Sequence, residues 1–367
     1  MNHDGAEDEP PASFPNSQSC PYSELPGSVS RDTLSRMLGV PRQGVFILLP
    51  VLNERKNIAE LPDRIERTLP VVTELGSLSQ SECAVCGKLL SGRPRVQLAG
   101  PRLSVCSNCG SWTYIPRPSC SEQLAQHDDD SYFAHPYFAL RREVSAATIR
   151  RCRDVFRRLA LAVNTDELAN LRLLDIGCNT GAFLQSAAQE FGTIPVGIDV
   201  GRAAVEAATR NGIEAYQARI EDAPEHLTGF PVITAIDLIE HVTEPLEFFL
   251  AIRRRLRPGG VVYIETPNAG SFVYRVGGIL CNLTGARPRK LFERLFPPQH
   301  IQYFTPGSLA ALAGNAGFEI VRIGTRVLPG SDIAASALVR LAMASLQVLD
   351  RCTSRCILIW AVLRRNT

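Results

Sequence analysis

The segment RLLDIGCNTGAFL, residues 172–184, constrains the fold of this chain more than any other. An apolar run predicts a strand near residues 172–177, glycines stand at 177 and 181, and a helical pattern then resumes. Glycine is the residue type that best tolerates a left-handed turn and a close approach of the backbone to a ligand. The segment therefore predicts a strand, a tight turn and the start of a helix, with a ligand beside the turn.

Further segments of strand length follow this turn and alternate with helical patterns. These strands are expected near residues 194–199, 214–218, 231–236 and 260–266. The alternation predicts a parallel sheet that helices cover on both faces. Asp199 closes the second strand 22 residues after Gly177, where an acid can accept both hydroxyl groups of a ribose. The glycine spacing is GxxxG, which departs from the GxGxxG of dinucleotide-binding folds.

The length of the chain indicates how many domains it contains, and its charge indicates which partners it favours. A chain of 367 residues indicates two or more units. With 39 Lys and Arg against 37 Asp and Glu, the net charge of +2 does not favour a nucleic-acid partner. Residues 1–43 are rich in Pro, Ser, Glu and Asp and are predicted to form a disordered tail. They do not have the pattern of a secretion signal, which predicts a cytoplasmic location.

Two longer segments have patterns of their own. Residues 141–165 have apolar residues at helical spacing together with seven arginines, and they are interpreted as a helix with one apolar and one solvated charged face. Residues 334–363 are apolar, but charged side chains divide them into pieces too short to cross a bilayer, so a helix followed by the strand CILIWAVL is predicted. The dividing residues are Arg340, Asp350, Arg351 and Arg355.

Eleven cysteines in a cytoplasmic chain are expected to be free thiols or metal ligands. Four of them form two CxxC pairs, CAVC at 83–86 and CSNC at 106–109, with 19 residues between the pairs. Two such pairs can close a tetrahedral zinc site without an open coordination position, which is a structural site. We therefore predict a zinc ribbon and its lead-in over residues 80–135, with Cys83, Cys86, Cys106 and Cys109 as ligands.

Residues 44–72 resemble the opening strand, turn and helix of family-2 glycosyltransferases. The resemblance covers about 29 residues, and no later segment supplies the rest of such a domain. One strand and one helix cannot make a nucleotide site, so we interpret the segment as a remnant or accessory element.

Six segments from residue 140 to the end of the chain resemble class I S-adenosylmethionine-dependent methyltransferases, in the order expected for that class. They are LLDIGCNTGAFL, VGIDVGRAAVEAA, ARIEDAP, AIDLIEHVTEPLEFF, LRPGGVVYIETPN and HIQYFTPGSLAALAGNAGFEI. They are most similar to the branch of ubiquinone-type O-methyltransferases. The resemblance implies a Rossmann-like α/β fold whose seven-stranded sheet ends in an antiparallel pair, GFEIVRIGTRVL and CILIWAVL. The cysteine-rich segment likewise resembles the zinc-ribbon lead-in of a bacterial subgroup, in which an acidic segment such as HDDDSYF precedes the methyltransferase.

The resemblance implies a site for S-adenosylmethionine. Gly177 and Gly181 would line its methionine portion, with Asp175 shaping the turn. Asn179 stands where many relatives have glycine, and asparagine tolerates the left-handed conformation better than most residues. The implied site consists of Asp175, Gly177, Asn179, Gly181, Asp199, Val200, Glu221, Asp222, Asp237 and Leu238.

The other implied contacts follow the later strands. Asp199 would hold the ribose hydroxyls, and Glu221 and Asp222 would border the adenine. Asp237 and Leu238, after the fourth strand, would flank the other side of the cofactor.

Methyl transfer from a sulfonium depends mostly on the alignment of the acceptor, the methyl group and the sulfur. A hydroxyl acceptor also benefits from a general base. His300, before a helix expected to begin with Thr305 as N-cap and Pro306 at N1, and His241 in the IEHV segment are the candidates. A histidine that anchors the loop, or one paired structurally with Glu240, is the alternative interpretation of each.

The stretch 269–299 is longer than a connection requires, so we expect it to form its own helices and to cover the acceptor site. The sequence thus predicts a methyltransferase that acts on a hydroxyl of a small-molecule or glycan-linked acceptor. A sugar C-methyltransferase, an rRNA base methyltransferase and a non-enzymatic partner protein with a degenerate fold remain alternatives. Neither the acceptor nor the oligomeric state follows from the sequence.

Overall fold

The computed structural model describes residues 82–90, 94–98, 102–128, 143–163, 169–329 and 337–366. The chain divides into two compact units, Met1–Gly76 and Ser77–Thr367, and all described residues belong to the second. The expected tail at 1–43, the glycosyltransferase-like segment at 44–72 and most of the acidic segment at 127–133 therefore lie outside the described residues.

A seven-stranded sheet forms the centre of the second unit, in the order β10-β11-β8-β7-β4-β5-β6. Strands β8, β7, β4, β5 and β6 run parallel, while β11 lies antiparallel between β8 and β10. This confirms the predicted Rossmann-like sheet and its terminal antiparallel pair. The strands are β4 (Arg172–Ile176), β5 (Ile194–Asp199), β6 (Glu214–Gln217), β7 (Phe230–Ile236), β8 (Leu256–Pro267), β10 (Phe318–Arg326) and β11 (Leu358–Arg365).

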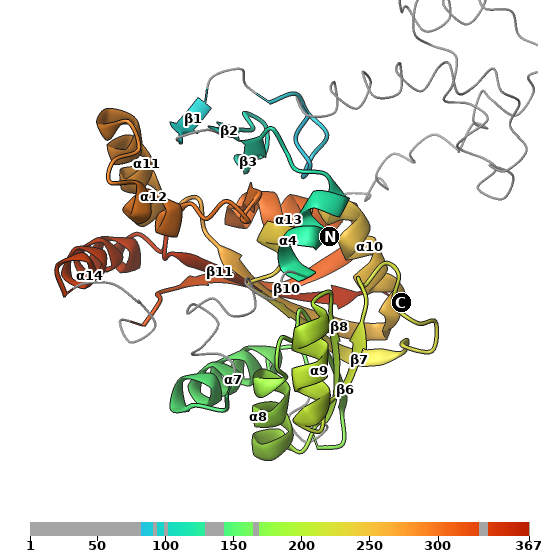
Figure 1. Ribbon diagram of the computed structural model, residues 1–367. Coiled ribbons are helices and arrows are strands. Elements are labelled where there is room, and N and C mark those ends of the chain that lie inside the picture. The colour runs from blue at the N-terminus through green and yellow to red at the C-terminus, as the bar shows by residue number, and fades with distance from the viewer. Residues whose placement is uncertain are drawn as a thin grey trace, which may run out of the picture. The chain divides into compact units, whose positions relative to one another are not determined.

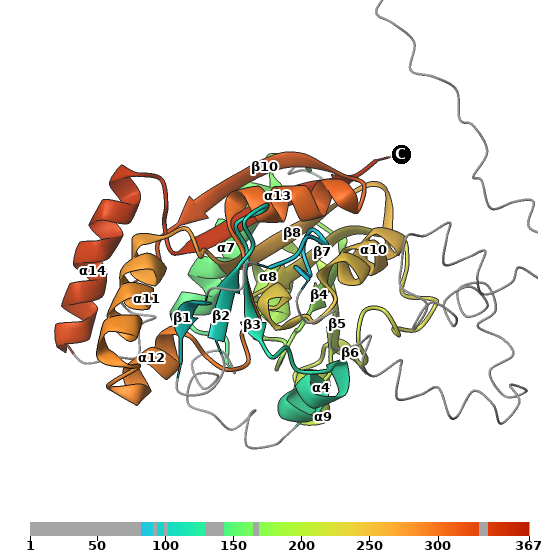
Figure 2. The same ribbon diagram turned by 90° about the horizontal axis from the view of Figure 1, so that it is seen from above.

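Helices cover both faces of this sheet, as Figures 1 and 2 show. Successive residues of a strand point to opposite faces, so Leu173 packs toward the first helix group and its neighbour Leu174 toward the second. The first group is α7 (Ala146–Leu159), α8 (Ala182–Phe191) and α9 (Arg202–Arg210), and the second is α10 (Pro245–Arg255) and α13 (Pro306–Asn315). The helix α13 begins as predicted, with Thr305 as N-cap and Pro306 in the first turn.

The cysteine-rich segment belongs to a second, antiparallel sheet of four strands in the order β1-β2-β3-β9. Its members are β1 (Pro94–Gln97), β2 (Arg102–Val105), β3 (Trp112–Ile115) and β9 (Gln302–Tyr303). The last strand comes from the methyltransferase-like part of the sequence, so the two parts share one sheet. The helix α4 (Cys120–Asp128) follows β3 after a short link.

The stretch 269–299 forms helices of its own, α11 (Phe272–Thr284) and α12 (Arg289–Leu295), as expected. Both pack with the four-stranded sheet in one apolar cluster that includes Tyr274, Phe296 and Trp112. The helix α14 (Ala337–Cys352) packs beside α11 and precedes β11, in agreement with the predicted helix and strand. None of the helices in the described part of the chain is long and apolar enough to cross a membrane.

Candidate functional site

The glycine turn after β4 has the backbone conformation that the sequence predicts. Gly177 and Gly181 both have φ of +76°, and Asn179 between them has φ of +50°. A Cβ atom on Gly181 would lie 2.7 Å from Cγ1 of Ile213, and one on Gly177 would lie 3.1 Å from Cδ1 of Leu238. Both glycines therefore suit the left-handed conformation, and at Gly181 a side chain would also overlap Ile213.

Asp199 closes β5 beside this turn and orders it. One carboxylate oxygen accepts a hydrogen bond from the backbone N–H of Asn179, and the other accepts one from the N–H of Gly201, each at 2.9 Å. A carboxylate accepts hydrogen bonds and does not donate them, which is the chemistry that ribose hydroxyls require of a partner. Two backbone amides therefore hold the carboxylate in place.

The loop after β6 carries the two acids expected near the adenine. Glu221 is mostly buried and lies 3.1 Å from the guanidinium of Arg219. The side chain of Asp222 is 70% exposed and lies 3.8 Å from the same guanidinium. Val200 contributes its backbone carbonyl to Gln217, which donates to it at 3.1 Å. Glu221 is thus the better fixed of the two acids.

Asp175 lies in the core beneath the sheet edge rather than at the turn itself. Its Oδ1 accepts a hydrogen bond of 2.7 Å from the hydroxyl of Thr234 on β7. Burial raises the pKa of this carboxyl to about 7, because the charged form loses its hydration. Asp175 therefore links β4 to β7 directly below the residues that form the turn.

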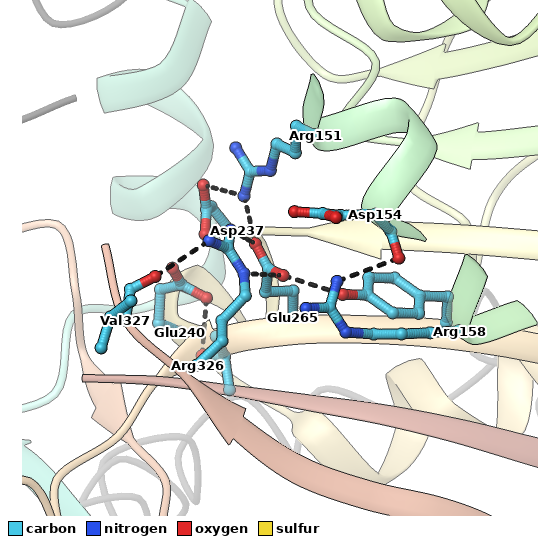
Figure 3. A network of polar contacts seen from close by, with 10 residues as sticks. Arg151, Asp154, Arg158, Asp237, Glu240, Glu265, Arg326 and Val327 are labelled. Atoms are coloured by element: carbon cyan, nitrogen blue, oxygen red, sulfur yellow. Dashed lines mark hydrogen bonds and ion pairs between the residues drawn. The ribbon is translucent and has the colours of Figure 1, made fainter. Parts of the chain in front are cut away.

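Asp237 belongs to a charged network that joins four elements, as Figure 3 shows. Arg151 of α7 donates to Asp237 at 2.7 Å and to Glu265 of β8 at 2.6 Å. Arg326 of β10 makes two further hydrogen bonds to Glu265, and the hydroxyl of Tyr263 donates to it at 2.8 Å. Although burial opposes ionisation, the two arginines hold the pKa of Glu265 well below its usual range. Asp237, which has a φ of +54°, is fixed by this network at the end of β7.

Sequence reasoning missed three members of the network, Arg151, Glu265 and Arg326. The interpretation of Arg151 as part of a solvated charged face is wrong, because this residue is paired with two acids and mostly buried. The available signal was the single acid in the apolar strand segment VVYIETP. A buried carboxylate in such a strand requires a cationic partner.

The rings of His241, at the end of the short helix η4 (Ile239–His241), and His300, just before β9, lie against each other. The helix η4 places His241 so that the two ring centroids lie 4.7 Å apart, with the ring planes at 90°. The Nδ1–H of His241 donates to the carbonyl oxygen of Gln299 at 2.9 Å. In the neutral ring the lone pair is then on Nε2, which is the nitrogen that can accept a proton.

Glu240 joins the two histidines. One oxygen of its carboxylate and one nitrogen of each ring all lie within 4.8 Å of one another. Glu240 is buried and accepts a hydrogen bond of 2.9 Å from the hydroxyl of Thr266. Two imidazoles and a carboxylate can hold either a proton or a divalent cation.

The four cysteines of the two CxxC pairs converge. Their sulfur atoms all lie within 4.8 Å of one another, with Cys83 Sγ 3.6 Å from Cys109 Sγ and Cys86 Sγ 3.5 Å from Cys106 Sγ. With Zn–S bonds of about 2.3 Å, a tetrahedral zinc site separates its sulfurs by about 3.8 Å. The arrangement therefore fits a metal ion bound by four thiolates.

The fold and the glycine turn define the class of this domain. A seven-stranded sheet with one antiparallel insertion, a glycine turn after its first strand and an acid at the end of its second define a class I methyltransferase domain. Residues 141–323 match the family described as "Methyltransferase domain". The chain carries a methyltransferase domain of the S-adenosylmethionine-dependent class.

Among curated proteins, the chain is similar to several named ubiquinone biosynthesis O-methyltransferase. The protein from Saccharophagus degradans is 28% identical over 42% of this chain and 66% of its own length. The protein from Vibrio vulnificus is 31% identical over 31% of this chain and 52% of its own length. The matches thus span between about half and two thirds of these relatives.

Solved structures with a similar fold include a phosphoethanolamine N-methyltransferase 2 of Haemonchus contortus in complex with S-adenosyl-L-methionine. It is 16% identical, covers 70% of this chain and 62% of its own, and has a TM-score of 0.48. A SAM-dependent methyltransferase from Archaeoglobus fulgidus is also 16% identical, covers 63% and 100%, and has a TM-score of 0.43. The strand order described above, rather than these distant likenesses, defines the fold.

Proposed function

We propose that the chain transfers a methyl group from S-adenosylmethionine to a hydroxyl of a small-molecule or glycan-linked acceptor. The carboxylate of Asp199, fixed by the backbone amides of Asn179 and Gly201, is the observation that carries the proposal. Bound S-adenosylmethionine supplies an electrophilic methyl group on a sulfonium. The pre-ordered carboxylate costs no reorganisation when it receives hydroxyl groups.

The other residues of the site support the same function. Gly177 and Gly181 adopt the positive φ that the turn requires, while Glu221 follows β6, and Asp237 and Leu238 follow β7, at the carboxyl edge of the sheet. In open parallel sheets, ligands bind at this edge. We assign the methionine portion of the cofactor to the glycine turn, the ribose to Asp199 and the adenine to the loop that holds Glu221.

A hydroxyl acceptor is supported by the histidine pair and by the names of the curated relatives. Nε2 of His241 can remove the acceptor proton, because Nδ1–H is committed to the Gln299 carbonyl. His300 stands against the same ring and is the alternative base. The relatives in Saccharophagus and Vibrio are named O-methyltransferases, which agrees with oxygen as the methylated atom.

We further propose that Cys83, Cys86, Cys106 and Cys109 bind one structural zinc ion. Their sulfur separations support this assignment, and four thiolates leave no open coordination position. Metal analysis of the purified protein should give one zinc per chain, and a Cys86→Ser, Cys109→Ser double variant should give much less. Cys352→Ser, which replaces an exposed cysteine of α14, is the control and should retain the metal.

The decisive experiment on the activity is calorimetric titration with S-adenosylmethionine and S-adenosylhomocysteine. Asp199→Ala should weaken binding roughly ten- to a hundredfold, the range expected for hydrogen bonds to a charged group. Asp222→Ala, which removes a mostly exposed acid from the same edge, should change it by less than about threefold. A folded wild-type protein that gives no heat with either ligand would refute the proposed function.

Once binding is established, the acceptor can be identified by transfer of a labelled methyl group. Hydroxylated aromatic compounds and glycosides are the two acceptor sets to compare. Label on oxygen supports the proposal, whereas label on a sugar carbon identifies the alternative C-methyltransferase.

A further inference from the structure

The segment before β9 is held from the side of the cysteine-rich sheet. The backbone N–H of Tyr114 donates to the carbonyl of Ile301 at 3.0 Å, and the hydroxyl of Thr113 donates to the side-chain carbonyl of Gln302 at 2.9 Å. The hydroxyl of Tyr114 also donates to the carbonyl of Phe296 at 3.0 Å. His300 is thus bracketed by contacts from β3 on both sides in the sequence.

A second hold on this segment comes from a single side chain of α4. Nε2 of Gln123 donates to the carbonyl oxygen of His241 at 3.1 Å and to that of Gln299 at 3.2 Å. One of these carbonyls belongs to the first histidine, and the other immediately precedes the second. The side chain of Gln123 is only 5% exposed, so water competes little for these hydrogen bonds.

The position of Gln123 is itself set by the cysteine-rich sheet. The helix α4 begins five residues after the end of β3, and its first turn is closed by Ser119 and Glu122. The N–H of Ser119 donates to the Glu122 carboxylate at 2.7 Å, and the N–H of Glu122 donates to the Ser119 hydroxyl at 3.2 Å. This reciprocal cap fixes the start of the helix. The helix then presents Gln123 one turn later to the two carbonyls.

From these contacts we infer that Gln123 is a positioning residue for the histidine pair, supplied by the segment that follows the cysteine-rich sheet. The inference rests on the proposed function, in which one of these histidines removes the acceptor proton. Gln123 does not touch the reacting atoms. It holds the backbone of His241 and of Gln299, the residue before His300, and it orients the Gln299 carbonyl that fixes the tautomer of His241.

The chemistry of the amide group explains why glutamine suits this position. Its single nitrogen carries two hydrogens and can donate to both carbonyls at once. A glutamate of the same shape would instead place carboxylate oxygens against two carbonyl oxygens. A methionine would fill a similar volume without any donor, leaving two partly buried carbonyls without this partner.

The test compares Gln123→Met and Gln123→Glu with the wild-type protein. Each variant is titrated with S-adenosylmethionine, its imidazole nitrogens are observed by ¹⁵N NMR, and its turnover is measured with the acceptor found by the labelling screen. Gln185→Met is the matched control, because the amide of Gln185 also donates to a backbone carbonyl, that of Asn211 at 2.8 Å, but on an exposed surface of α8.

For Gln123→Met we expect S-adenosylmethionine affinity within about twofold of wild type and kcat lowered about ten- to a hundredfold, the cost of a small misplacement at a reacting centre. The fraction of His241 in the Nδ1–H tautomer should fall, and the NMR signal of this tautomer should weaken accordingly. Gln123→Glu should show the same changes, and Gln185→Met should show none of them.

The inference is overturned if folded Gln123→Met keeps both the wild-type imidazole spectrum and the wild-type kcat. Circular dichroism and thermal unfolding establish that the variant is folded, and Gln123→Glu provides a second variant should it not be. The NMR readout does not require turnover. A protein that binds no S-adenosylmethionine, yet whose imidazole signals change on substitution of Gln123, would refute the proposed activity while the positioning contact stands.

Discussion

Arg326 on β10 makes a two-pronged ion pair with Glu265 on β8, reaching past the strand β11 that lies between them. Nε of Arg326 is 2.8 Å from one carboxylate oxygen, and Nη2 is 2.6 Å from the other. Glu265 is fully buried and also binds Arg151 of α7. The pair therefore joins the antiparallel edge of the sheet to its parallel part. Arg151, which binds both Glu265 and Asp237, connects the pair to Asp237.

Replacement of Arg326 by methionine should lower the free energy of unfolding by about 3 kcal/mol. The buried carboxylate of Glu265 would then keep only one of its two cationic partners, Arg151. Urea denaturation at pH 7 measures the change. Arg322→Met, at an exposed position of the same strand, should stay within about 0.5 kcal/mol of wild type. Equal effects of the two substitutions would show that the ion pair does not stabilise the sheet.

The same pair should appear in the acid dependence of stability. Arg151 and Arg326 hold the pKa of Glu265 below the ordinary 4.5. A lowered pKa in the folded state contributes stability that is present above 4.5 and is lost as the pH falls below that value. In Arg326→Met the loss on acidification should be smaller. Denaturation curves at several pH values between 3 and 6 check this, and an unchanged slope in the variant would contradict it.

Asp175→Asn should remove a pH dependence of the opposite sign. Burial raises the pKa of Asp175 from 3.8 to about 7, so the folded state binds the proton more tightly than the unfolded state. The contribution of this group is greatest below 3.8 and is lost as the pH rises to about 7. It can change the free energy of unfolding by at most about 1.4 kcal/mol per pH unit.

The asparagine variant should therefore be more stable than wild type near pH 8 and should show a flatter profile between pH 4 and 7. Its side-chain carbonyl can still accept the hydrogen bond from Thr234. Asp222→Asn, at a mostly exposed position, is the control and should keep the wild-type profile. If Asp175→Asn is less stable than wild type at pH 8, the negative charge of Asp175 does not destabilise the folded protein.

Gly181→Ala should destabilise the protein by about 2–4 kcal/mol, because it combines an unfavourable positive φ with a Cβ only 2.7 Å from Ile213. Gly212→Ala separates the two effects, since Gly212 has φ of +79° and a Cβ added there would meet nothing within 4 Å. It should cost only about 1 kcal/mol. Thermal and urea unfolding of both variants provide the comparison, and equal costs would exclude the steric contribution.

Removal of metal by a chelator under reducing conditions should lower the midpoint of thermal unfolding by at least about 5 °C. The reason is that Cys83 and Cys106 belong to the same buried cluster as Phe304 and Leu309 of the main domain. Loss of the metal would therefore loosen packing beyond the cysteine-rich segment. Re-addition of zinc should restore the midpoint, and a midpoint insensitive to both steps would exclude a stabilising metal.

The strands of the parallel sheet could be predicted because their pattern is local. The expected strand at 194–199 coincides with β5, and the one at 172–177 ends one residue beyond β4. Alternation of residues such as Leu173 and Leu174 between two faces follows from the geometry of a strand alone. The strand β8 begins earlier than expected, at Leu256, because Leu256 pairs with Phe230 of β7. A register shift separates this pair from the rest of the ladder, and a local sequence pattern does not predict such a shift.

The site was only partly visible in the sequence. Glycines and an acid at the end of a strand have a recognisable spacing, so the sequence predicts the turn and the position of Asp199 beside it. Arg151 lies in a segment with seven arginines, and nothing in the sequence distinguishes it as the partner of two acids. Gln123 has no motif at all. Its role depends on two carbonyls 118 and 176 residues away, which only the tertiary fold brings together.

The two-residue strand β9 has a consequence for how the chain is made. The hydroxyl of Thr113 meets Gln302 across a separation of 189 positions, so the four-stranded sheet is incomplete until most of the chain has been synthesised. During that interval the edge of β3 is unpaired, and such edges favour association with other chains. A metal ion bound early by the two cysteine pairs would give this segment an ordered structure before β9 has been synthesised.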